Sequence, residues 1–595
     1  MSDLSGVKRI FDIPPYQLGK YNLGTALAHR VTGTWESISS AEYVEKINTA
    51  ARGLLRLGVK KGDKIGLVSA NRMEWCILDQ AVMKIGAVTV PVYPTVSQDD
   101  YLYIFNHSEI RFCFVADGFL YNKLSRIKNG MPHLEAIYSF DKAEGTVSWD
   151  TVLEKGRDMS AQEEVEAIAS TILPDDVATL IYTSGTTGTP KGVLLSHDNI
   201  LSNVKIALPR VQEIEGTRAL SFLPLCHIYE RTVNLAYQTL GCGVYFAKST
   251  ETIAADAMDA KPVIMMVVPR VVEKIYTKIV SKAEVLSGFK KAVFSWAVNL
   301  GMKYEPYHNN WFYRMRLAVA RRLVFNKWKQ AMGGHLRIMI SGSSSLDAKL
   351  SRLFCAAGII LNEGYGLTET SPIISTNIYP NRGLRIGSIG RPFENLDVRI
   401  ADDGEILVKG PSVMKGYYKD PERTAAAFDK DGYFMTGDIG HLSDGFLYIT
   451  DRKKEMFKTS GGKYITPQPM ENKLMQSRFI EQAMVVGDGR KHPAVIIEPD
   501  LEELKEWCGE NGVLYTDAVT VLSDHRVNAM YRKIINEVNR TLGNWEKIRH
   551  FRLVPDRWSI EGGELTPTLK VKRRRLLEKY SALIDSIYEE ENGAG

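Results

Sequence analysis

The 595-residue chain is too long for one ordinary hydrophobic core, so at least two domains are expected, with a large first one. Hydrophobic residues make up 44% of the chain and charged residues 24%, which is typical of a folded soluble protein and excludes a disordered or collagen-like one. The 75 Lys and Arg against 70 Asp and Glu leave a formal net charge of +5, too small an excess to argue for nucleic acid as a partner.

The cysteines and the start of the chain favour a reducing, cytoplasmic location. None of the cysteines has CxxC or zinc-ligand spacing, so buried free thiols are expected at Cys76, Cys113, Cys226, Cys242, Cys355 and Cys508. The opening stretch has no apolar run before a small-residue cleavage site, and no secretory signal is expected. Runs such as Val263–Val268 are far shorter than the ~20 residues of a membrane-spanning helix, which leaves peripheral attachment to the cytoplasmic membrane face.

The first part of the chain predicts alternating helices and strands. Ser39 and Glu42 have capping-box spacing, and the apolar residues after them recur on one helical face until a turn at Gly58. Lys64–Ser69 then predicts a strand. Similar alternation recurs at Ala81–Val92, Phe112–Val115 and Val177–Tyr182. Buried strands between helices predict the α/β class, with layers of largely parallel sheet and helix.

A basic stretch rich in aromatic residues predicts inserted helices at about residues 281–335. Its acidic residues are only Glu284 and Glu305, whereas Lys and Arg recur throughout. Its aromatic residues include Phe289, Phe294, Trp296, Trp311, Phe312, Tyr313, Phe325 and Trp328. Two interpretations stay open: a solvated basic helical face with its aromatic side chains in the core, or a patch that binds a membrane surface.

The pattern of apolar and turn-forming residues changes from Asp402 onward. Short strand patterns separated by Gly turns predict a small β-subdomain over Glu405–Thr450, and after Pro469 helical patterns dominate. A domain boundary is therefore expected near Asp451.

The segment YTSGTTGTPKGV, which begins at Tyr182, predicts a loop that binds phosphates. Small hydroxyl and glycine residues can close around a polyphosphate, and Lys191 supplies a positive charge. The flanking segments VATLIYT and GVLLSH both predict strands, whereas the loop of a Walker A motif opens a helix. A plain Ser/Thr/Gly turn is the weaker interpretation, because such turns rarely extend this far.

The segment NEGYGLTET, which begins at Asn362, predicts a site for a flat ring beside a phosphate. Glycines around Tyr365 let the backbone approach a ring, and the Tyr365 side chain can stack on that ring. Thr368 can reach a phosphate oxygen, and Glu369 offers the hard oxygen that Mg²⁺ prefers. Alone, this motif would be read as a surface loop.

Five segments occur in the order YTSGTTGTPKGV, EGYGLTET, YFMTGD, DRKKEMFK and ELTPTLKVKR. From the helix after Ser39 to Arg575 the chain resembles the adenylate-forming superfamily of acyl-CoA synthetases, peptide-synthetase adenylation domains and beetle luciferases. LPLCHIYER, the basic insertion, the DRKKEMFK linker and TPTLK in place of the commoner SGK resemble the long-chain fatty acyl-CoA synthetases in particular.

This resemblance implies a domain plan and a reaction. A large N-terminal adenylate-forming domain is expected at residues 1–450, a hinge at 451–456 and a small mobile α+β lid domain at 457–595. ATP, a long-chain fatty acid and coenzyme A are the implied substrates, with Mg²⁺ as the metal. The carboxylate attacks the α-phosphorus of ATP to give acyl-AMP and pyrophosphate, and the thiol of coenzyme A then displaces AMP.

The resemblance also assigns residues to ATP and the metal. The residues implied to hold the phosphates are Thr183, Ser184, Gly185, Thr186, Thr187, Gly188 and Lys191, with Thr183 and Glu369 on Mg²⁺. The rest of the implied nucleotide site consists of Glu363, Gly364, Tyr365, Gly366, Thr368, Asp438, Arg452, Lys454 and Lys458, of which Asp438 and Arg452 take the ribose hydroxyls. Surface lysines remain an alternative for Lys454 and Lys458.

Three residues are implied in the chemistry and the acyl site. Lys570 matches the adenylation lysine of the C-terminal domain, where it bridges the attacking carboxylate and the α-phosphate. His227 matches a histidine beside the acyl tunnel, with a structural histidine as an equal alternative. Gly342 matches a position where only a hydrogen keeps the tunnel clear.

Three other functions agree less well with the sequence. A fatty acyl-AMP ligase, or a synthetase that hands the acyl group to a carrier protein, has the same fold, but the long-chain type of insertion argues against it. An inactive adenylate-binding protein has no need of Lys191, Glu369, Asp438 and Lys570 together. Nucleic-acid binding through the basic insertion is a distant third.

Overall fold

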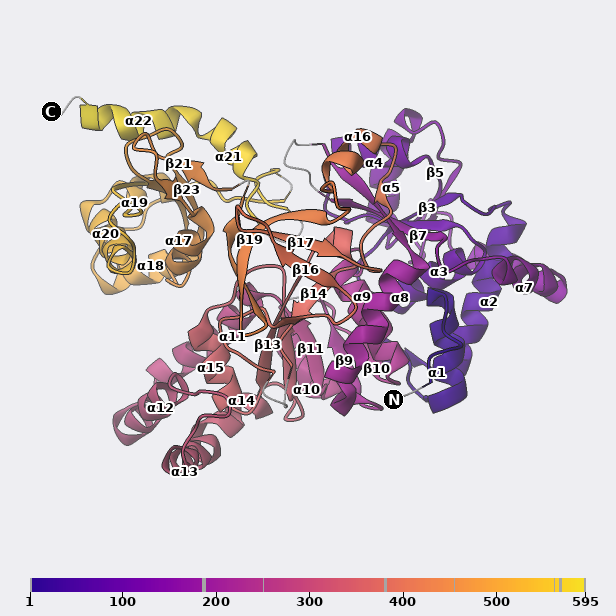
Figure 1. Cartoon of the computed structure of the whole chain (residues 1–595), viewed down its shortest axis with the longest axis horizontal. Coiled ribbons are helices and arrows are strands. Elements are labelled where there is room, and N and C mark those ends of the chain that lie inside the picture. The colour runs from indigo at the N-terminus through magenta and orange to yellow at the C-terminus, as the bar shows by residue number, and fades with distance from the viewer. Residues whose placement is uncertain are drawn as a thin grey trace.

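The structure, a computed structural model, describes residues 3–183, 189–249, 251–378, 383–453, 455–560, 562–566 and 570–592. Two large sheets and the helices around them form the body of the molecule (Figure 1). The segment from β21 (Phe457–Lys458) through α17 (Pro467–Leu474) and onward forms a lobe at one side of that body. The predicted α/β class is therefore confirmed.

The first sheet carries strands that the sequence predicts. Among the described residues it has seven strands, in the spatial order β18 (Gly416–Tyr417), β8 (Lys191–Ser196), β7 (Val177–Thr183), β4 (Val88–Pro91), β3 (Lys64–Val68), β5 (Ile110–Val115) and β6 (Ala136–Ser139). Neighbours from β7 to β6 are parallel, whereas β8 and β18 are antiparallel. The strands predicted on both sides of the phosphate loop are thus adjacent partners.

The expectation of strand alternation over Ala81–Val92 is wrong in its first part. Residues 81–84 complete helix α3 (Met73–Lys84), and β4 begins only at Val88, after a turn in which Gly86 has a φ of +72°. Helix α3 is buried on nearly all sides, so its apolar run lacks the polar face that marks a surface helix. Periodicity alone does not distinguish such a run from a buried strand.

The second sheet crosses the middle of the chain. Its nine strands among the described residues follow the order β15 (Arg391–Pro392), β14 (Ile373–Thr376), β13 (Ile360–Gly366), β12 (Ile338–Ser341), β11 (Ile264–Val267), β9 (Arg218–Ser221), β10 (Gly243–Phe246), β1 (Leu27–Val31) and β2 (Thr34–Ile38). The interior pairs are parallel, and each end of the sheet finishes on antiparallel strands.

Helices α8 (His197–Ala207) and α9 (Ile228–Thr239) lie between the two sheets. Almost every residue of α9 is buried, as expected of a helix covered on both sides. One hydrophobic core contains side chains from both sheets and from both helices. An apolar cavity opens within this layer.

Helix α2 (Ser40–Arg56) begins as predicted. Ser39 is its N-cap and accepts a hydrogen bond from the Glu42 backbone N–H, while the Glu42 side chain accepts one from the Ser39 backbone. This reciprocal capping satisfies two of the amides that a helix start leaves without partners.

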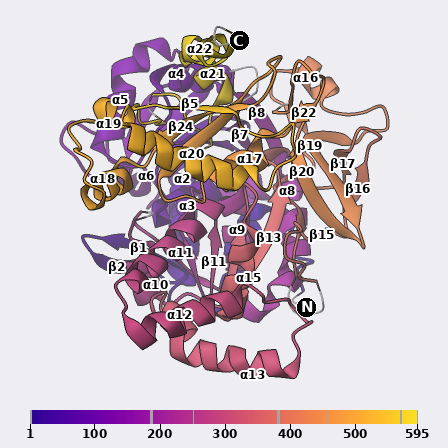
Figure 2. The ribbon, with the colours of Figure 1, turned by 90° about the vertical axis from the view of Figure 1, so that its left-hand side faces the viewer.

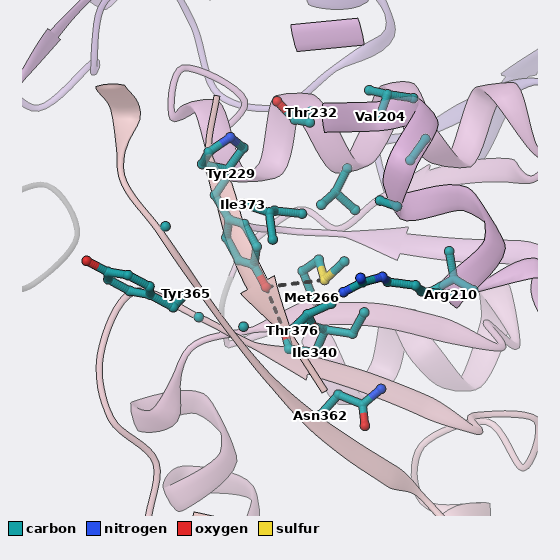
Figure 3. A pocket seen from close by; sticks show the side chains of 18 of the residues that line it. Val204, Arg210, Tyr229, Thr232, Met266, Ile340, Asn362, Tyr365, Ile373 and Thr376 are labelled. Atoms are coloured by element: carbon teal, nitrogen blue, oxygen red, sulfur yellow. Dashed lines mark hydrogen bonds between the residues drawn. The ribbon is translucent and has the colours of Figure 1, made fainter. Parts of the chain in front are cut away.

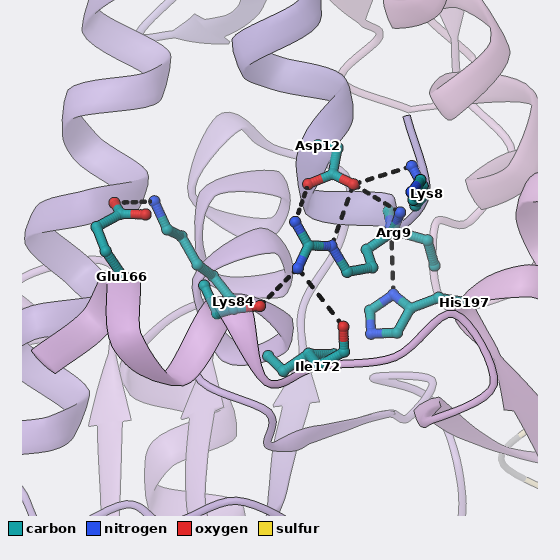
Figure 4. A network of polar contacts seen from close by, with 9 residues as sticks. Lys8, Arg9, Asp12, Lys84, Glu166, Ile172 and His197 are labelled. Atoms are coloured by element: carbon teal, nitrogen blue, oxygen red, sulfur yellow. Dashed lines mark hydrogen bonds and ion pairs between the residues drawn. The ribbon is translucent and has the colours of Figure 1, made fainter. Parts of the chain in front are cut away.

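A polar network anchors the N-terminal segment (Figure 4). The Arg9 guanidinium pairs with Asp12 and donates to the Ala169 carbonyl at 2.6 Å, and the Ile10 N–H donates to His197 Nδ1 at 3.2 Å. Burial lowers the pKa of His197 to about 3, so this ring stays neutral and serves as an acceptor. His197 is therefore structural.

The remaining short elements of the body surround the sheets. Its other helices are α1 (Ile13–Tyr21), α4 (Gln98–Ser108), α5 (Gly118–Ile127), α6 (Asp150–Lys155), α7 (Gln162–Ser170), α10 (Ile253–Ala260), α15 (Ala348–Ala356) and α16 (Pro421–Ala426). Its 3₁₀ turns are η1 (Ile10–Asp12), η2 (Lys128–Gly130), η3 (Met159–Ala161), η4 (Leu208–Arg210), η5 (Gln212–Ile214) and η7 (Thr368–Thr370).

The basic aromatic stretch is helical, as predicted. Its elements are α11 (Pro269–Glu284), α12 (Gly288–Gly301), α13 (Trp311–Ala320), the π-helical turn η6 (Arg321–Phe325) and α14 (Asn326–Gln330). Its aromatic side chains divide into two groups: Phe325 and Trp328 are in a core, whereas Phe289 and Trp311 are 82% and 72% exposed. Helices α12 and α13 lie at the outer edge of the molecule in both views (Figures 1 and 2).

A small sheet follows, and the lobe comes after it. The small sheet consists of β16 (Asp397–Ile400), β17 (Glu405–Lys409), β19 (Phe434–Ser443) and β20 (Phe446–Arg452). The lobe contains β21 (Phe457–Lys458), β22 (Tyr464–Ile465), β23 (Ile480–Val486), β24 (Ala494–Pro499), β25 (His550–Leu553), α17, α18 (Leu501–Glu510), α19 (Ala518–Leu522), α20 (His525–Asn539), α21 (Arg573–Lys579) and α22 (Ser581–Asn592). The lobe has hydrophobic cores of its own.

All six cysteines are free and buried, as predicted. Over the described ranges, no helix combines the length and the apolar composition that crossing a membrane requires.

Candidate active site

A carboxylate and a guanidinium stand opposite each other where β19 pairs with β20. The strand register places Asp438 directly across from Arg452, and Arg452 Nε is 3.1 Å from Asp438 Oδ1. The Tyr365 hydroxyl donates to Asp438 Oδ2 at 2.6 Å. Asp438 is only 3% exposed. A buried carboxylate beside a planar donor is suited to gripping two neighbouring hydroxyls of a ligand.

Lys570 lies beside this pair. Burial first, and then the charge of Arg452, lower the pKa of Lys570 to about 8, against the opposing effect of Asp438. The Lys570 N–H donates to Thr566 Oγ1 at 3.0 Å, and the Thr566 N–H donates back to the Lys570 carbonyl at 2.7 Å. These two hydrogen bonds join Thr566 to Lys570, so the C-terminal lobe brings a lysine to residues of the body.

His227 lines an apolar cavity and lies within electrostatic reach of Lys570. It caps the start of α9 and accepts a hydrogen bond at Nδ1 from the Tyr229 N–H at 3.2 Å. Burial, with a contribution from the charge of Lys570, lowers the pKa of His227 to about 4, so the ring is neutral at pH 7. With Nδ1 accepting, the ring proton sits on Nε2, which can donate to a ligand.

A second cluster gathers at the end of β7. Thr183 is paired in register with Lys191 across the phosphate loop. The Lys191 ammonium lies 4.7 Å from the centre of the Tyr417 ring, and the Tyr417 hydroxyl donates to Glu369 Oε1 at 2.9 Å. A threonine hydroxyl, a carboxylate and a lysine thus converge where the loop begins.

The oxygen donors of this cluster fit the Mg²⁺ that the resemblance implies. No group of three His, Cys, Asp or Glu side chains that could hold a metal is found in the described part of the chain. Mg²⁺ is usually held by one or two protein oxygens, with waters and substrate phosphates completing its shell. Glu369 and Thr183 can supply these one or two protein oxygens.

The two glycines beside Tyr365 have different roles. A Cβ on Gly366 would lie 1.8 Å from the Pro372 carbonyl oxygen, so this glycine permits the packing of β13 on the next strand. A Cβ on Gly364 would meet nothing closer than 3.5 Å. Both glycines line the cavity, so neither places a side chain in it.

An apolar cavity extends from this site into the layer between the sheets (Figure 3). Apolar side chains form most of its lining, as is usual for a small-molecule site. His227 and Gly364 line it near the polar cluster, and Met266 and Ile340 form part of its wall. Both methionines of β11 belong to the hydrophobic core, and Met266 also faces the cavity.

Gly342 also lines the cavity. A Cβ at Gly342 would lie 3.0 Å from Cζ of the Tyr229 ring. The Tyr229 hydroxyl donates to the Ile340 carbonyl at 3.1 Å and lies 3.4 Å from Met266 Sδ. The missing side chain at Gly342 therefore makes room for a tyrosine that forms one wall of the cavity.

The other predicted residues are placed less centrally. Thr368 and Glu363 are buried near Tyr365, and burial raises the pKa of Glu363 to about 8. Lys458 is exposed on β21, where its ammonium lies 4.7 Å from the centre of the Tyr464 ring in the lobe. The predicted residues Ser184, Gly185, Thr186, Thr187, Gly188 and Lys454 lie outside the described residues.

Sequence reasoning missed Tyr417 and Tyr229. Tyr417 follows a glycine in a pair of tyrosines far from any quoted motif, and only the pairing of β18 with β8 brings it to Glu369. Tyr229 lies two residues after His227 in the segment LPLCHIYER. Its helical spacing carried no sign that its ring would face the cavity.

An adenylate-forming enzyme fits this arrangement of a buried carboxylate paired with an arginine, an apolar cavity and a lysine from the C-terminal lobe. The chain belongs to the AMP-binding enzyme family: that family's model matches residues 20–418, and the model of the AMP-binding enzyme C-terminal domain matches residues 455–592.

Similar proteins are known by sequence and by structure. The long-chain-fatty-acid–CoA ligase FadD15 of Mycobacterium bovis is 34% identical over 569 residues, covering 94% of each chain. Long chain acyl-CoA synthetase 7, a peroxisomal protein of Arabidopsis thaliana, is 33% identical, over 97% of this chain and 85% of its own. The A domain of the carboxylic acid reductase of Segniliparus rugosus, solved with AMP and a carboxylic acid, has a TM-score of 0.74 at 21% identity, over 98% of this chain and 94% of its own.

Proposed function

We propose that the chain is an AMP-forming ligase that joins long-chain fatty acids to coenzyme A. The observation that carries the proposal is the position of Lys570, which lies beside Asp438 and Arg452 and within electrostatic reach of His227 on the cavity wall. The proposed nucleotide site and the apolar cavity thus both lie close to the Lys570 ammonium. The names of the relatives point to the same activity.

In the proposed first half-reaction, a carboxylate oxygen of the fatty acid attacks the α-phosphorus of ATP. The bond from that phosphorus to the bridging oxygen breaks, pyrophosphate leaves, and acyl-AMP remains. Negative charge builds up around the α-phosphorus, where a protonated Lys570 stabilises it, and His227 donates its Nε2 hydrogen to an acyl or phosphate oxygen. Mg²⁺ supplies neutralisation of the phosphate charge, with Thr183 and Glu369 as its protein ligands.

The remaining residues take the roles that the resemblance implies. The loop from Thr183 to Lys191 binds the terminal phosphates, Thr368 the α-phosphate, and Asp438 with Arg452 the ribose. The adenine is held by the segment Glu363–Gly366. The opening of Gly364 toward the cavity and the pairing of Asp438 with Arg452 support these roles.

In the proposed second half-reaction, the thiol of coenzyme A loses its proton, its sulfur attacks the acyl carbon, and AMP leaves. We propose that the lobe at 457–595 rotates about a hinge at 451–456 between the two steps. Among the described residues, the polar contacts between the lobe and the body include the partly buried pair of Arg270 and Glu481 at 2.8 Å and the Asn472 amide, which donates to Ser345 Oγ at 2.5 Å. Single ion pairs and hydrogen bonds near the surface are individually weak.

The proposal includes peripheral attachment to the cytoplasmic membrane face. Its support is the exposed side of α13, where Trp311, Phe312, Met315 and Val319 stand beside Arg314 and Arg316. Aromatic and basic residues on an exposed helix are typical of binding at an anionic membrane surface.

The proposed activity is tested by supplying palmitate and ATP with and without coenzyme A, and by following pyrophosphate and palmitoyl-CoA. Formation of both products in the complete mixture is expected. Pyrophosphate release with coenzyme A left unused would instead identify an acyl-AMP ligase or a synthetase that loads a carrier protein. No pyrophosphate from any fatty acid would exclude both.

A further inference from the structure

One charged residue stands in the wall of the otherwise uncharged acyl cavity. Among the described residues that line it, Arg210 is the only Arg, Lys, Asp or Glu. Arg210 and Tyr365 lie on opposite sides of the cavity, so the arginine is at the end remote from the nucleotide site (Figure 3). Its neighbours in the wall at that end include Val211 and Phe393. Arginine is rarely buried unless it is paired, so this position calls for a physical reason.

The Arg210 guanidinium is held on three sides. Its Nη2 donates to both carboxylate oxygens of Glu394, at 2.7 and 2.8 Å, and its Nη1 lies 3.4 Å from the Arg391 carbonyl oxygen. Its central carbon is 4.3 Å from the centre of the Phe393 ring. A guanidinium stacked on a ring and paired with a carboxylate is fixed in orientation.

The pair also spans from the cavity to the solvent. The Arg210 side chain is 6% exposed, whereas the Glu394 side chain is 68% exposed. Arg210 ends the turn η4 after α8, and Phe393 and Glu394 follow the edge strand β15. The arginine therefore bridges the helix layer and the sheet edge, and its guanidinium is paired with an exposed carboxylate.

We propose that Arg210, clamped by Glu394 and Phe393, is the end wall of the acyl cavity and sets the longest acyl chain that the enzyme accepts. This inference rests on the proposed ligase function. A longer acyl chain that extends to Arg210 contacts a guanidinium that is already paired with Glu394 and stacked on the Phe393 ring. It gains no contact there unless the guanidinium is displaced from Glu394 and from the Phe393 ring, so further methylenes add no binding energy.

The test is a series of saturated acids from octanoate to lignocerate, assayed as kcat/KM for acyl-CoA formation. Arg210→Ala opens the wall, and the preference for behenate or lignocerate relative to palmitate is expected to rise roughly tenfold or more, the usual effect of pocket room for added methylenes. The change should appear mainly in KM for the longer acids. Because Glu394 is exposed, the thermal midpoint should move little.

Two further variants make the result specific. Glu394→Ala releases the guanidinium without removing it, and a smaller shift in the same direction is expected. Arg385→Ala is the matched control: Arg385 pairs with the exposed Asp444 at 3.0 Å and lies 4.4 Å from the centre of the Phe446 ring, but it does not line the cavity. Its chain-length profile should equal that of the wild type.

An unchanged profile in both Arg210→Ala and Glu394→Ala would overturn the end wall, as would an equal shift in Arg385→Ala. If Arg210→Ala does not fold, the profile of Glu394→Ala decides the question. Failure of the ligase proposal would look different, because the wild-type protein itself would then make no acyl-CoA from any acid in the series.

Discussion

The Tyr417 hydroxyl donates a hydrogen bond of 2.9 Å to Glu369, and the ring of the same tyrosine lies 4.7 Å from the Lys191 ammonium. One tyrosine thus contacts both the proposed metal-binding carboxylate and the lysine that follows the phosphate loop. It holds the carboxylate in place before the nucleotide arrives.

Glu369→Gln is expected to lower the rate of adenylation by roughly 10²-fold or more, because a proposed Mg²⁺ ligand loses its charge beside the reacting phosphates. ATP affinity should fall less. Tyr417→Phe keeps the carboxylate and loses only the hydrogen bond, so its loss should be smaller. Pyrophosphate release, measured over a range of Mg²⁺ concentrations, checks both variants. Full activity of Glu369→Gln at ordinary Mg²⁺ contradicts the metal assignment.

Lys570→Ala separates the two half-reactions. If the lobe presents Lys570 only for adenylation, acyl-AMP formation from palmitate and ATP should fall by roughly 10²-fold or more, because a cation is lost from the transition state. Conversion of synthetic palmitoyl-AMP and coenzyme A to palmitoyl-CoA should be spared. Loss of both activities would show that Lys570 is structural, and loss of neither would move the role to another residue of the KVKRRR segment.

Adenylation should depend on the protonation of Lys570. Its pKa is lowered to about 8 by burial and by the charge of Arg452, and only the protonated form stabilises the transition state. The adenylation kcat/KM should therefore be flat below pH 8 and fall tenfold per unit above it. Any activity that remains in Lys570→Arg should lack this alkaline decline, because a guanidinium stays charged. His227, with a pKa of about 4, contributes no titration near neutrality.

Alanine at each of the two glycines beside Tyr365 is expected to have a different effect, one on the stability of the fold and the other on the affinity for ATP. Gly366→Ala places a methyl group 1.8 Å from the Pro372 carbonyl oxygen and is expected to destabilise the fold by about 1–3 kcal/mol. Gly364→Ala meets nothing within 3.5 Å, so its stability should be nearly unchanged while its affinity for ATP falls. Thermal unfolding and nucleotide binding measure the two effects. Equal destabilisation of both variants would contradict this distinction.

Membrane attachment predicts a dependence on salt. The protein should sediment partly with anionic liposomes at low ionic strength and be released at high salt, because basic residues near an anionic surface are screened. Replacing Trp311 and Phe312 by serine should reduce the bound fraction. Serine at Leu514, which is 79% exposed in the lobe, is the control for loss of a surface apolar side chain. Soluble protein at every salt concentration would identify α13 as a solvated face.

Local features of the sequence determined the elements that depend on near neighbours. The capping box at Ser39 and Glu42, the strands beside the phosphate loop and the helices of the basic insertion all formed as predicted, because spacing along the chain decides them. Residues 81–84 were misread because a short apolar run suits a buried helix and a buried strand equally.

Only the tertiary structure decided which distant residues meet. Strand register placed Arg452 across from Asp438, β18 carried Tyr417 to Glu369, and the approach of a sheet edge to the end of α8 clamped Arg210 against Glu394. Each meeting depends on pairing between segments far apart in the chain, and no local spacing encodes that pairing. The motifs thus identified the residue types on which the proposed chemistry depends, and long-range packing determined where the charged residues lie.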